Sequence, residues 1–104
     1  MSDELVKIGQ LNDFPVGALK RVLVGKDAVV VANVDGRLYA IGASCTHRGG
    51  PLDEGELQGT VVTCPWHGGQ FDLNNGGAIT PPPTKNAVSF KVEIKGQDVM
   101  IRTK

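Results

Sequence analysis

Apolar and polar residues alternate along residues 88–95, and this pattern restricts the fold more than any other feature of the chain. The apolar members are Val88, Phe90, Val92 and Ile94. Successive side chains of a β-strand point to opposite faces of a sheet, so the segment predicts a strand with one buried and one solvated face. No long stretch of the sequence has helical periodicity. The sequence therefore predicts an all-β protein.

Short apolar runs elsewhere predict the remaining strands. They cover residues 6–8, 19–24, 28–33, 38–41 and 99–101. The pair Asp35-Gly36 is the strongest hairpin signal in the sequence, because a type I′ turn needs positive φ at both of its central residues. We expect the apolar residues of these strands to form the core.

Length and charge limit the class of protein. At 104 residues the chain has the size of one domain, and we expect residues 1–104 to fold as a single unit. Lys and Arg together number 11, as do Asp and Glu, which argues against a nucleic-acid partner. No apolar stretch is long enough to span a membrane, and the acidic start Met1-Ser2-Asp3-Glu4 is unlike a secretory signal. We therefore expect a cytoplasmic protein.

The middle of the chain, about residues 43–84, differs in composition from its two flanks. It holds both cysteines, both histidines and the only tryptophan, together with several Gly-Gly pairs and the run Pro81-Pro82-Pro83. Glycine permits tight bends, and proline stiffens the backbone. The composition predicts a loop-rich subdomain inserted into a β base that the rest of the chain forms.

Two short segments of this subdomain each supply one thiol and one imidazole. They are Cys45-Thr46-His47 and Cys64-Pro65-Trp66-His67, and they contain all the cysteines and histidines of the chain. A cysteine pair in a cytoplasmic protein is more often metal-binding or catalytic than a disulfide. The sequence therefore predicts a metal centre, and its ligands are Cys45, His47, Cys64 and His67.

The order of the ligands favours iron over zinc. A structural zinc site usually groups its cysteines together and its histidines together, whereas each segment here mixes the two types. A two-iron cluster explains the mixture, because one iron takes both thiolates and the other takes both imidazoles. A binding module stabilised by zinc stays open as an alternative, and a visible absorption spectrum distinguishes the two.

These residues resemble the motif of the Rieske proteins, C-x-H followed by C-x2-H. Neighbouring residues extend the similarity, since Cys64-Pro65-Trp66-His67-Gly68 and Phe71-Asp72 are also similar to that family. The resemblance covers nearly the whole chain. It implies one [2Fe-2S] cluster and a fold of three stacked antiparallel sheets with the cluster loops at one tip. It also implies exposed histidine ligands that serve as the electron port.

The sequence departs from the respiratory Rieske proteins in both loops. Those proteins join the loops by a disulfide, whereas Gly50 and Trp66 stand at the equivalent positions here. They also carry a serine and a tyrosine where this chain has Gly69 and Phe71. The chain therefore more closely resembles the ferredoxin components of aromatic-ring dioxygenase systems. Donors to the cluster raise its reduction potential, so their absence implies a value at the low end of the Rieske range.

The resemblance implies a one-electron carrier between an NAD(P)H-dependent flavin reductase and a terminal dioxygenase. We expect a monomer with these two proteins as partners. The small subunit of an assimilatory NADH-dependent nitrite reductase is an alternative with the same implied fold. We do not expect an independent enzyme, because no residues remain for a mononuclear-iron domain. No nucleophile–base set remains either, once both histidines are ligands.

Overall fold

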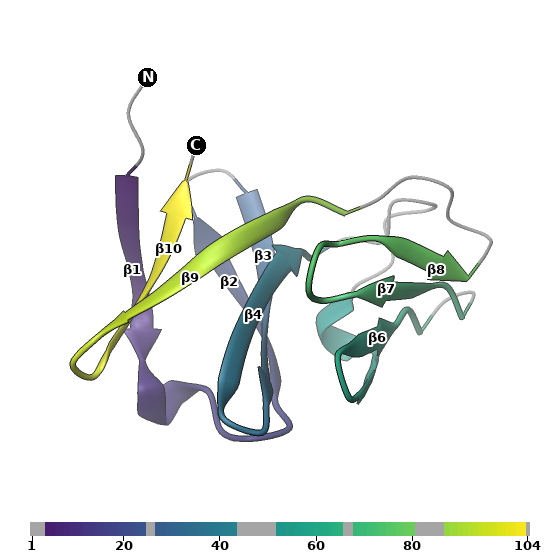
Figure 1. The fold of residues 1–104 in the computed structure, drawn as a ribbon, viewed down its shortest axis with the longest axis horizontal. Coiled ribbons are helices and arrows are strands. Elements are labelled where there is room, and N and C mark those ends of the chain that lie inside the picture. Colours follow the sequence, from purple (N-terminus) through teal and green to yellow (C-terminus); the bar gives the residue numbers. More distant parts are fainter. Residues whose placement is uncertain (1–3, 25–26, 44–51, 66–67, 81–86, 104) are drawn as a thin grey trace.

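A computed structural model of the chain describes all residues except 1–3, 25–26, 44–51, 66–67, 81–86 and 104 (Figure 1). The strands of the first half are β1 (Glu4–Gln10), β2 (Leu19–Val24), β3 (Asp27–Val34) and β4 (Arg37–Gly42). The later strands are β5 (Glu56–Gln58), β6 (Val61–Thr63), β7 (Gln70–Asp72), β8 (Ala78–Thr80), β9 (Ser89–Lys95) and β10 (Asp98–Thr103). The short 3₁₀ helices of the described residues are η1 (Leu11–Asp13) and η2 (Leu52–Glu54). No helix in this part of the chain is long and apolar enough to cross a membrane.

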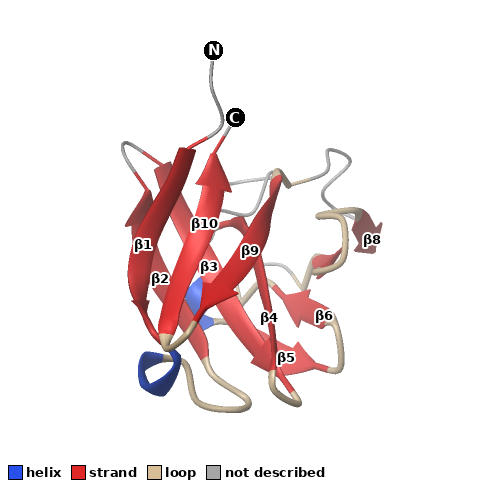
Figure 2. Cartoon of the chain, turned by 60° about the vertical axis from the view of Figure 1, so that its left-hand side comes forward, coloured by secondary structure: helices blue, strands red, loops and turns tan. Residues whose placement is uncertain are grey.

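The described strands form two antiparallel sheets, which confirms the all-β prediction. Six strands join in the order β1-β10-β9-β4-β3-β2, and four join in the order β5-β6-β7-β8. In the larger sheet, β9 pairs with β4 at Ser89 and Phe90 and with β10 from Lys91 onward. The sheet therefore folds over at β9, and Figure 2 shows β1, β10 and β9 in front of β2 and β3. These two halves and the smaller sheet are the three layers that the Rieske resemblance implies.

The two faces of β3 belong to two different cores. Val29 and Val31 pack in one cluster with Ile101 of β10. Val30 packs in a second cluster with Phe71 of β7. Side chains alternate along a strand, so neighbouring valines of β3 point to opposite layers. The layer β2–β3–β4 therefore lies in the middle, and β3 is buried on both faces, which explains its unbroken apolar run.

The predicted hairpin turn between β3 and β4 is confirmed. The ladder leaves only Asp35 and Gly36 unpaired, with φ of 53° and 95°. Positive φ at both positions is typical of a type I′ turn. The buried side chain of Asn33 supports the turn, because its Oδ1 accepts a hydrogen bond from the amide of Gly36 at 2.8 Å. Its Nδ2 donates to the carbonyl oxygen of Phe14 at 2.6 Å.

The middle segment has more regular structure than its composition indicates. Between residues 52 and 80 the chain forms the smaller sheet, whose four strands contain three residues each. Figure 1 shows this sheet beside β4 and the start of β9. Period-2 alternation cannot be recognised over three residues, so the sequence does not reveal these strands. The predicted proline-stiffened loop at 81–83 lies outside the described residues.

Candidate metal centre

Of the four predicted ligands, Cys64 lies within the described part of the chain. Cys45, His47 and His67 lie outside the described residues. Cys64 directly follows β6, is only 2% exposed, and carries a free thiol. A buried thiol outside a disulfide suits a soft metal ion or an iron–sulfur cluster.

The loop that carries Cys64 joins β6 to β7 and is closed by hydrogen bonds. Thr63 and Gln70 form the last pair of the β6–β7 ladder, and Gln70 Nε2 donates to Thr63 Oγ1 at 3.3 Å. Beyond this pair, the amide of Cys64 donates to the carbonyl oxygen of Gly69 at 2.7 Å. The amide of Gly68 donates to the carbonyl oxygen of Cys64 at 3.1 Å. The backbone of Cys64 is thus held on both sides of its Cα.

The predicted ligand pair of the first segment lies within residues 44–51. The two residues that flank this range, Ala43 and Leu52, are held by hydrogen bonds. The amide of Leu52 donates to the carbonyl oxygen of Ala43 at 2.8 Å. Ala43 is joined to the middle layer, because its own amide donates to the carbonyl oxygen of Ala28 at 3.0 Å. The first segment therefore begins and ends at adjacent points of the core.

The ends of both ligand segments meet in one core cluster. Ala43 and Leu52 flank the first segment, Cys64 opens the second, and all three belong to this cluster. Phe71 and Ala87 belong to it as well, and each of these residues is 6% exposed or less. We call Ala43, Leu52, Cys64, Phe71 and Ala87 the loop platform. The described residues that flank or open the two segments therefore belong to one part of the core.

The chemistry around Cys64 fits an iron–sulfur cluster. Phe71 is fully buried and Gly69 is also buried. Neither side chain can donate a hydrogen bond, and the apolar shell limits the access of water to a thiolate at this position. The residues that would hold the cluster are Cys45, His47, Cys64 and His67.

A close backbone approach fixes the strand next to the Cys64 loop. Gly55 precedes β5, and a Cβ atom at this position would lie 2.0 Å from the carbonyl oxygen of Thr63. Glu56 pairs with Thr63 in the β5–β6 ladder. Only glycine fits at position 55, so this residue helps to hold the strand that leads into Cys64. The sequence does not indicate this close approach, because Gly55 is one of 14 glycines and nothing in the sequence distinguishes it from the others.

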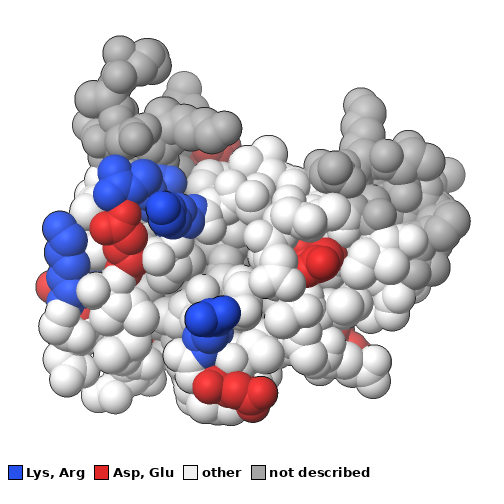
Figure 3. Space-filling view, viewed as in Figure 1, with Lys and Arg blue, Asp and Glu red and all other residues white. Residues whose placement is uncertain are grey.

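The charged side chains of the smaller sheet and its neighbouring turns are acidic. Within residues 52–80 they are Asp53, Glu54, Glu56 and Asp72, and this range contains no Lys or Arg. Figure 3 shows most of the visible Lys and Arg over the side of the molecule that carries β1, β9 and β10, where some Asp and Glu also lie, and further Lys or Arg near β4. The zero net charge of the chain therefore conceals an uneven distribution.

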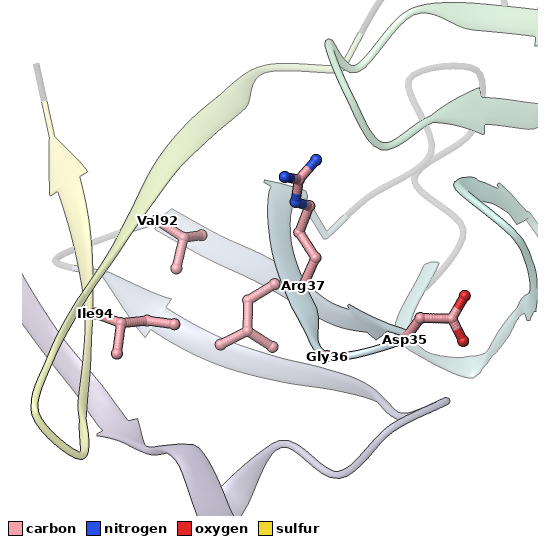
Figure 4. Close-up of a pocket in the computed structure, with 6 residues that line it drawn as sticks. Asp35, Gly36, Arg37, Val92 and Ile94 are labelled. Atoms are coloured by element: carbon pink, nitrogen blue, oxygen red, sulfur yellow. The ribbon is translucent and has the colours of Figure 1, made fainter.

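A separate hollow of about 450 Å³ lies where β9 leaves β4 (Figure 4). It is lined by Asp35, Gly36, Arg37, Leu38, Val92 and Ile94. Figure 4 shows Val92 and Ile94 on β9, across from the turn of the β3–β4 hairpin. The hollow lies at the turn end of β4, whereas residues 44–51 follow the opposite end of this strand. It is therefore not part of the candidate metal centre.

Several known proteins with similar sequences and structures are ferredoxins. The ferredoxin component of a naphthalene 1,2-dioxygenase system from Pseudomonas aeruginosa is 34% identical over 101 residues, which are 97% of each chain. The ferredoxin of carbazole 1,9a-dioxygenase from Nocardioides aromaticivorans IC177 has a TM-score of 0.92 at 25% identity, covering 96% of this chain and 98% of that one. A complex of reduced oxygenase and oxidized ferredoxin in carbazole 1,9a-dioxygenase contains a matching chain. Its TM-score is 0.87 at 35% identity, over 93% of this chain and 91% of that one.

A structure described as an NADH-dependent nitrite reductase small subunit from Mycobacterium tuberculosis also has this fold. Its TM-score is 0.89, but its sequence identity is only 14% over 100% of this chain and 98% of that one. At this identity the likeness shows a shared fold and says nothing about activity.

The family model of the Rieske [2Fe-2S] domain matches residues 4–100, which is nearly the whole chain. The three layers of sheet and the loop platform below both ligand segments agree with this match. The chain belongs to the family of Rieske [2Fe-2S] domains.

Proposed function

We propose that this chain is a one-electron carrier between an NAD(P)H-dependent flavin reductase and a terminal aromatic-ring dioxygenase. The observation that carries the proposal is the similarity to a dioxygenase ferredoxin component, at 34% identity over 97% of both chains. A similar ferredoxin chain occurs in a complex with its oxygenase, which supports an oxygenase as one partner. We infer a reductase as the second partner, because an electron carrier of this type needs an electron donor.

We infer that the cofactor is one [2Fe-2S] cluster, with Cys45, His47, Cys64 and His67 as its ligands. When bound, the cluster supplies one-electron redox chemistry at a higher potential than an all-cysteine cluster, because neutral imidazoles replace two thiolates. The structure supports Cys64 as a ligand through its burial and its fixed backbone. The loop platform would keep water from this thiolate.

The proposed role needs no catalytic residue in this chain. Both histidines of the sequence serve as ligands in the proposal, which leaves no imidazole for a nucleophile–base pair. The chain would therefore act as the electron-transfer component of a larger oxidoreductase system. Its own residues bind the cluster, shield the thiolate and present the ligand segments to a partner.

We further propose that residues 1–104 are one Rieske domain, with a cluster-binding subdomain at about 43–84 inserted into a β base. The family match over 4–100 supports this division. The pairing of β4 with β9 supports it as well, because these strands lie on either side of the insertion. We propose a cytoplasmic monomer.

The small subunit of a nitrite reductase is the second candidate function. One solved structure of that description has a TM-score of 0.89, so the fold is compatible with this role without favouring it. Its identity of 14% is far below the 34% shared with the dioxygenase ferredoxin component. The dioxygenase role is therefore the better supported of the two.

Metal and spectroscopic analysis tests the cofactor. The purified chain should contain iron and acid-labile sulfide in equal amounts and should give a rhombic EPR signal after reduction. His47→Ala and His67→Ala should each abolish the native cluster, because the chain has no spare histidine. Gln58→Ala, at an exposed position of β5, should retain it. Stoichiometric zinc without iron or sulfide would contradict the proposal.

Reconstitution of electron transfer tests the partners. The chain should support substrate hydroxylation by a terminal aromatic-ring dioxygenase when a flavin reductase and NADH are supplied. The parallel assay replaces the dioxygenase with the large subunit of a nitrite reductase and measures loss of nitrite. Activity only in the second assay would favour the nitrite reductase role.

A further inference from the structure

The turn after β7 contains the pair Asn75-Gly76, which is a chemically labile sequence. In deamidation, the backbone nitrogen of the following residue attacks the side-chain amide carbon of asparagine. A C–N bond forms, ammonia leaves and a succinimide results, which water then opens to aspartate or isoaspartate. Asparagine is among the thermolabile residue types, and glycine in the following position offers no side chain to hinder the attack.

The folded turn holds both reacting groups in hydrogen bonds. The amide nitrogen of Gly76, which is the attacking atom, donates to the carbonyl oxygen of Asp72 at 2.7 Å. Oδ1 of Asn75 accepts from the amide of Gly77 at 2.7 Å. The amide of Gly76 must leave its partner before its nitrogen can attack, whereas the bond to Oδ1 fixes the orientation of the Asn75 side chain. Local opening of the turn therefore has to precede the reaction.

The side chain of Asp72 fixes the start of the same turn. Its Oδ1 accepts from the amide of Asn74 at 2.9 Å and from Nδ2 of Asn74 at 3.0 Å. An aspartate that bonds the backbone two residues onward forms an Asx-turn, which stabilises this local conformation. Asp72 therefore holds the turn closed from both its carbonyl oxygen and its carboxylate.

The labile pair also joins the turn to the loop platform. The carbonyl oxygen of Gly76 accepts from the amide of Ala87 at 2.7 Å. Gly76 has φ of 75°, and a Cβ atom there would lie 2.1 Å from the carbonyl oxygen of Ala87, so the fold requires glycine. Isoaspartate at position 75 would add an atom to the backbone immediately before this contact and would displace the carbonyl.

We propose that Asn75 is a deamidation site that the folded turn protects, and that its conversion to isoaspartate detaches the turn from Ala87. The inference is independent of the cluster and of the proposed electron-transfer role. The turn 72–77 is then a site of slow chemical damage, because each local opening exposes the reactive amide of Gly76 to deamidation at Asn75.

Incubation of the full chain at mildly alkaline pH, followed by peptide mass spectrometry, tests the protection. Because the hydrogen bond from the Gly76 amide must open, deamidation at Asn75 should be several-fold to about tenfold slower in the folded chain than in urea. Asp72→Ala should accelerate the reaction several-fold while the circular dichroism spectrum remains native. Asp53→Ala, which removes a carboxylate outside the turn, should leave the rate unchanged. Equal rates in the folded chain and in urea would overturn the proposal.

The products test the second half of the proposal. Asn75→Asp keeps an oxygen that can accept from the amide of Gly77, so this variant should melt close to the unmodified chain. The isoaspartate form, separated by chromatography, should melt at a lower temperature, because only this form lengthens the backbone. An isoaspartate form with unchanged melting would contradict detachment, and modification at Asn74 in place of Asn75 would contradict the assigned site.

Discussion

The backbone amide of Leu52 donates to the carbonyl oxygen of Ala43 at 2.8 Å, and this bond closes the first ligand segment at its base. Both residues also pack in the loop platform beside Cys64. Leu52 has no exposed surface. The burial of one leucine side chain is therefore linked to the closure of the segment that holds two of the proposed ligands.

Leu52→Ala should destabilise the protein and loosen the first segment. Truncation of a fully buried leucine costs about 2–5 kcal/mol, because apolar contacts are lost and a cavity remains. Chemical denaturation should show this loss in the free energy of unfolding. The visible absorbance of the cluster should also decay faster in the variant than in the unmodified chain.

Leu23→Ala is the matched control, because Leu23 is 68% exposed on β2. A substitution at such a surface position usually changes stability by less than about 0.5 kcal/mol. If both variants lost stability equally, the loop platform would not have the role assigned to it.

Gly55→Ala should destabilise the smaller sheet. The new Cβ atom would lie 2.0 Å from the carbonyl oxygen of Thr63, so the start of β5 must move away from β6. Overpacking of this kind costs about 1–3 kcal/mol. In Gly42→Ala, by contrast, the nearest atom is the amide nitrogen of Val88 at 4.0 Å, which is an ordinary contact. Thermal unfolding of the two variants should therefore differ, and equal melting temperatures would disprove the close approach.

Asn33→Ala should weaken the base of the fold far from the metal centre. Asn33 is 8% exposed, and its side chain satisfies the carbonyl oxygen of Phe14 and the amide of Gly36. Groups left unpaired in a buried position cost about 1–3 kcal/mol. Urea denaturation should show a lower midpoint, whereas Asn12→Ala at an exposed position should not. An unchanged midpoint for Asn33→Ala would show that water replaces both hydrogen bonds.

The strands of the β base could be predicted because local signals are strong there. Alternation over residues 88–95 agrees with the strand β9, and Asp35-Gly36 forms the expected turn. The expected buried face of this segment is only partly formed, because Val88 is 61% and Ile94 is 46% exposed. The strands of the smaller sheet could not be predicted, because three residues are too few to show a period. They are stabilised by tertiary packing, which leaves no local pattern.

The candidate metal centre could be proposed from the sequence for a different reason. Cysteine and histidine are rare in this chain, so the spacing of Cys64 and the other three proposed ligands is visible in the sequence alone. The loop platform was not, because Ala43, Leu52 and Ala87 are common residue types whose proximity depends on the fold. All four ligands and the exposed electron port stay predictions, and Cys45, His47 and His67 lie outside the described part of the chain.

Gly69→Ser together with Phe71→Tyr should raise the reduction potential. Phe71 and Cys64 belong to the same buried core cluster, and we expect a hydroxyl added to the Phe71 ring to donate to the cluster or its thiolate. A serine at position 69 would place a second donor in the loop. One neutral hydrogen bond contributes about 0.5–1.5 kcal/mol net. For a one-electron couple, a tenfold change is about 59 mV, so each bond should add some tens of millivolts.

Voltammetry on the holoprotein measures this shift, and Gly69→Ala with Phe71→Leu is the control that changes side-chain size without adding a donor. The control should leave the potential nearly unchanged. A hydroxyl that found no acceptor in this apolar site would instead lower stability, because burying an unpaired polar group is unfavourable. An intact cluster with an unchanged potential in the serine–tyrosine variant would therefore show that Gly69 and Phe71 do not control the reduction potential.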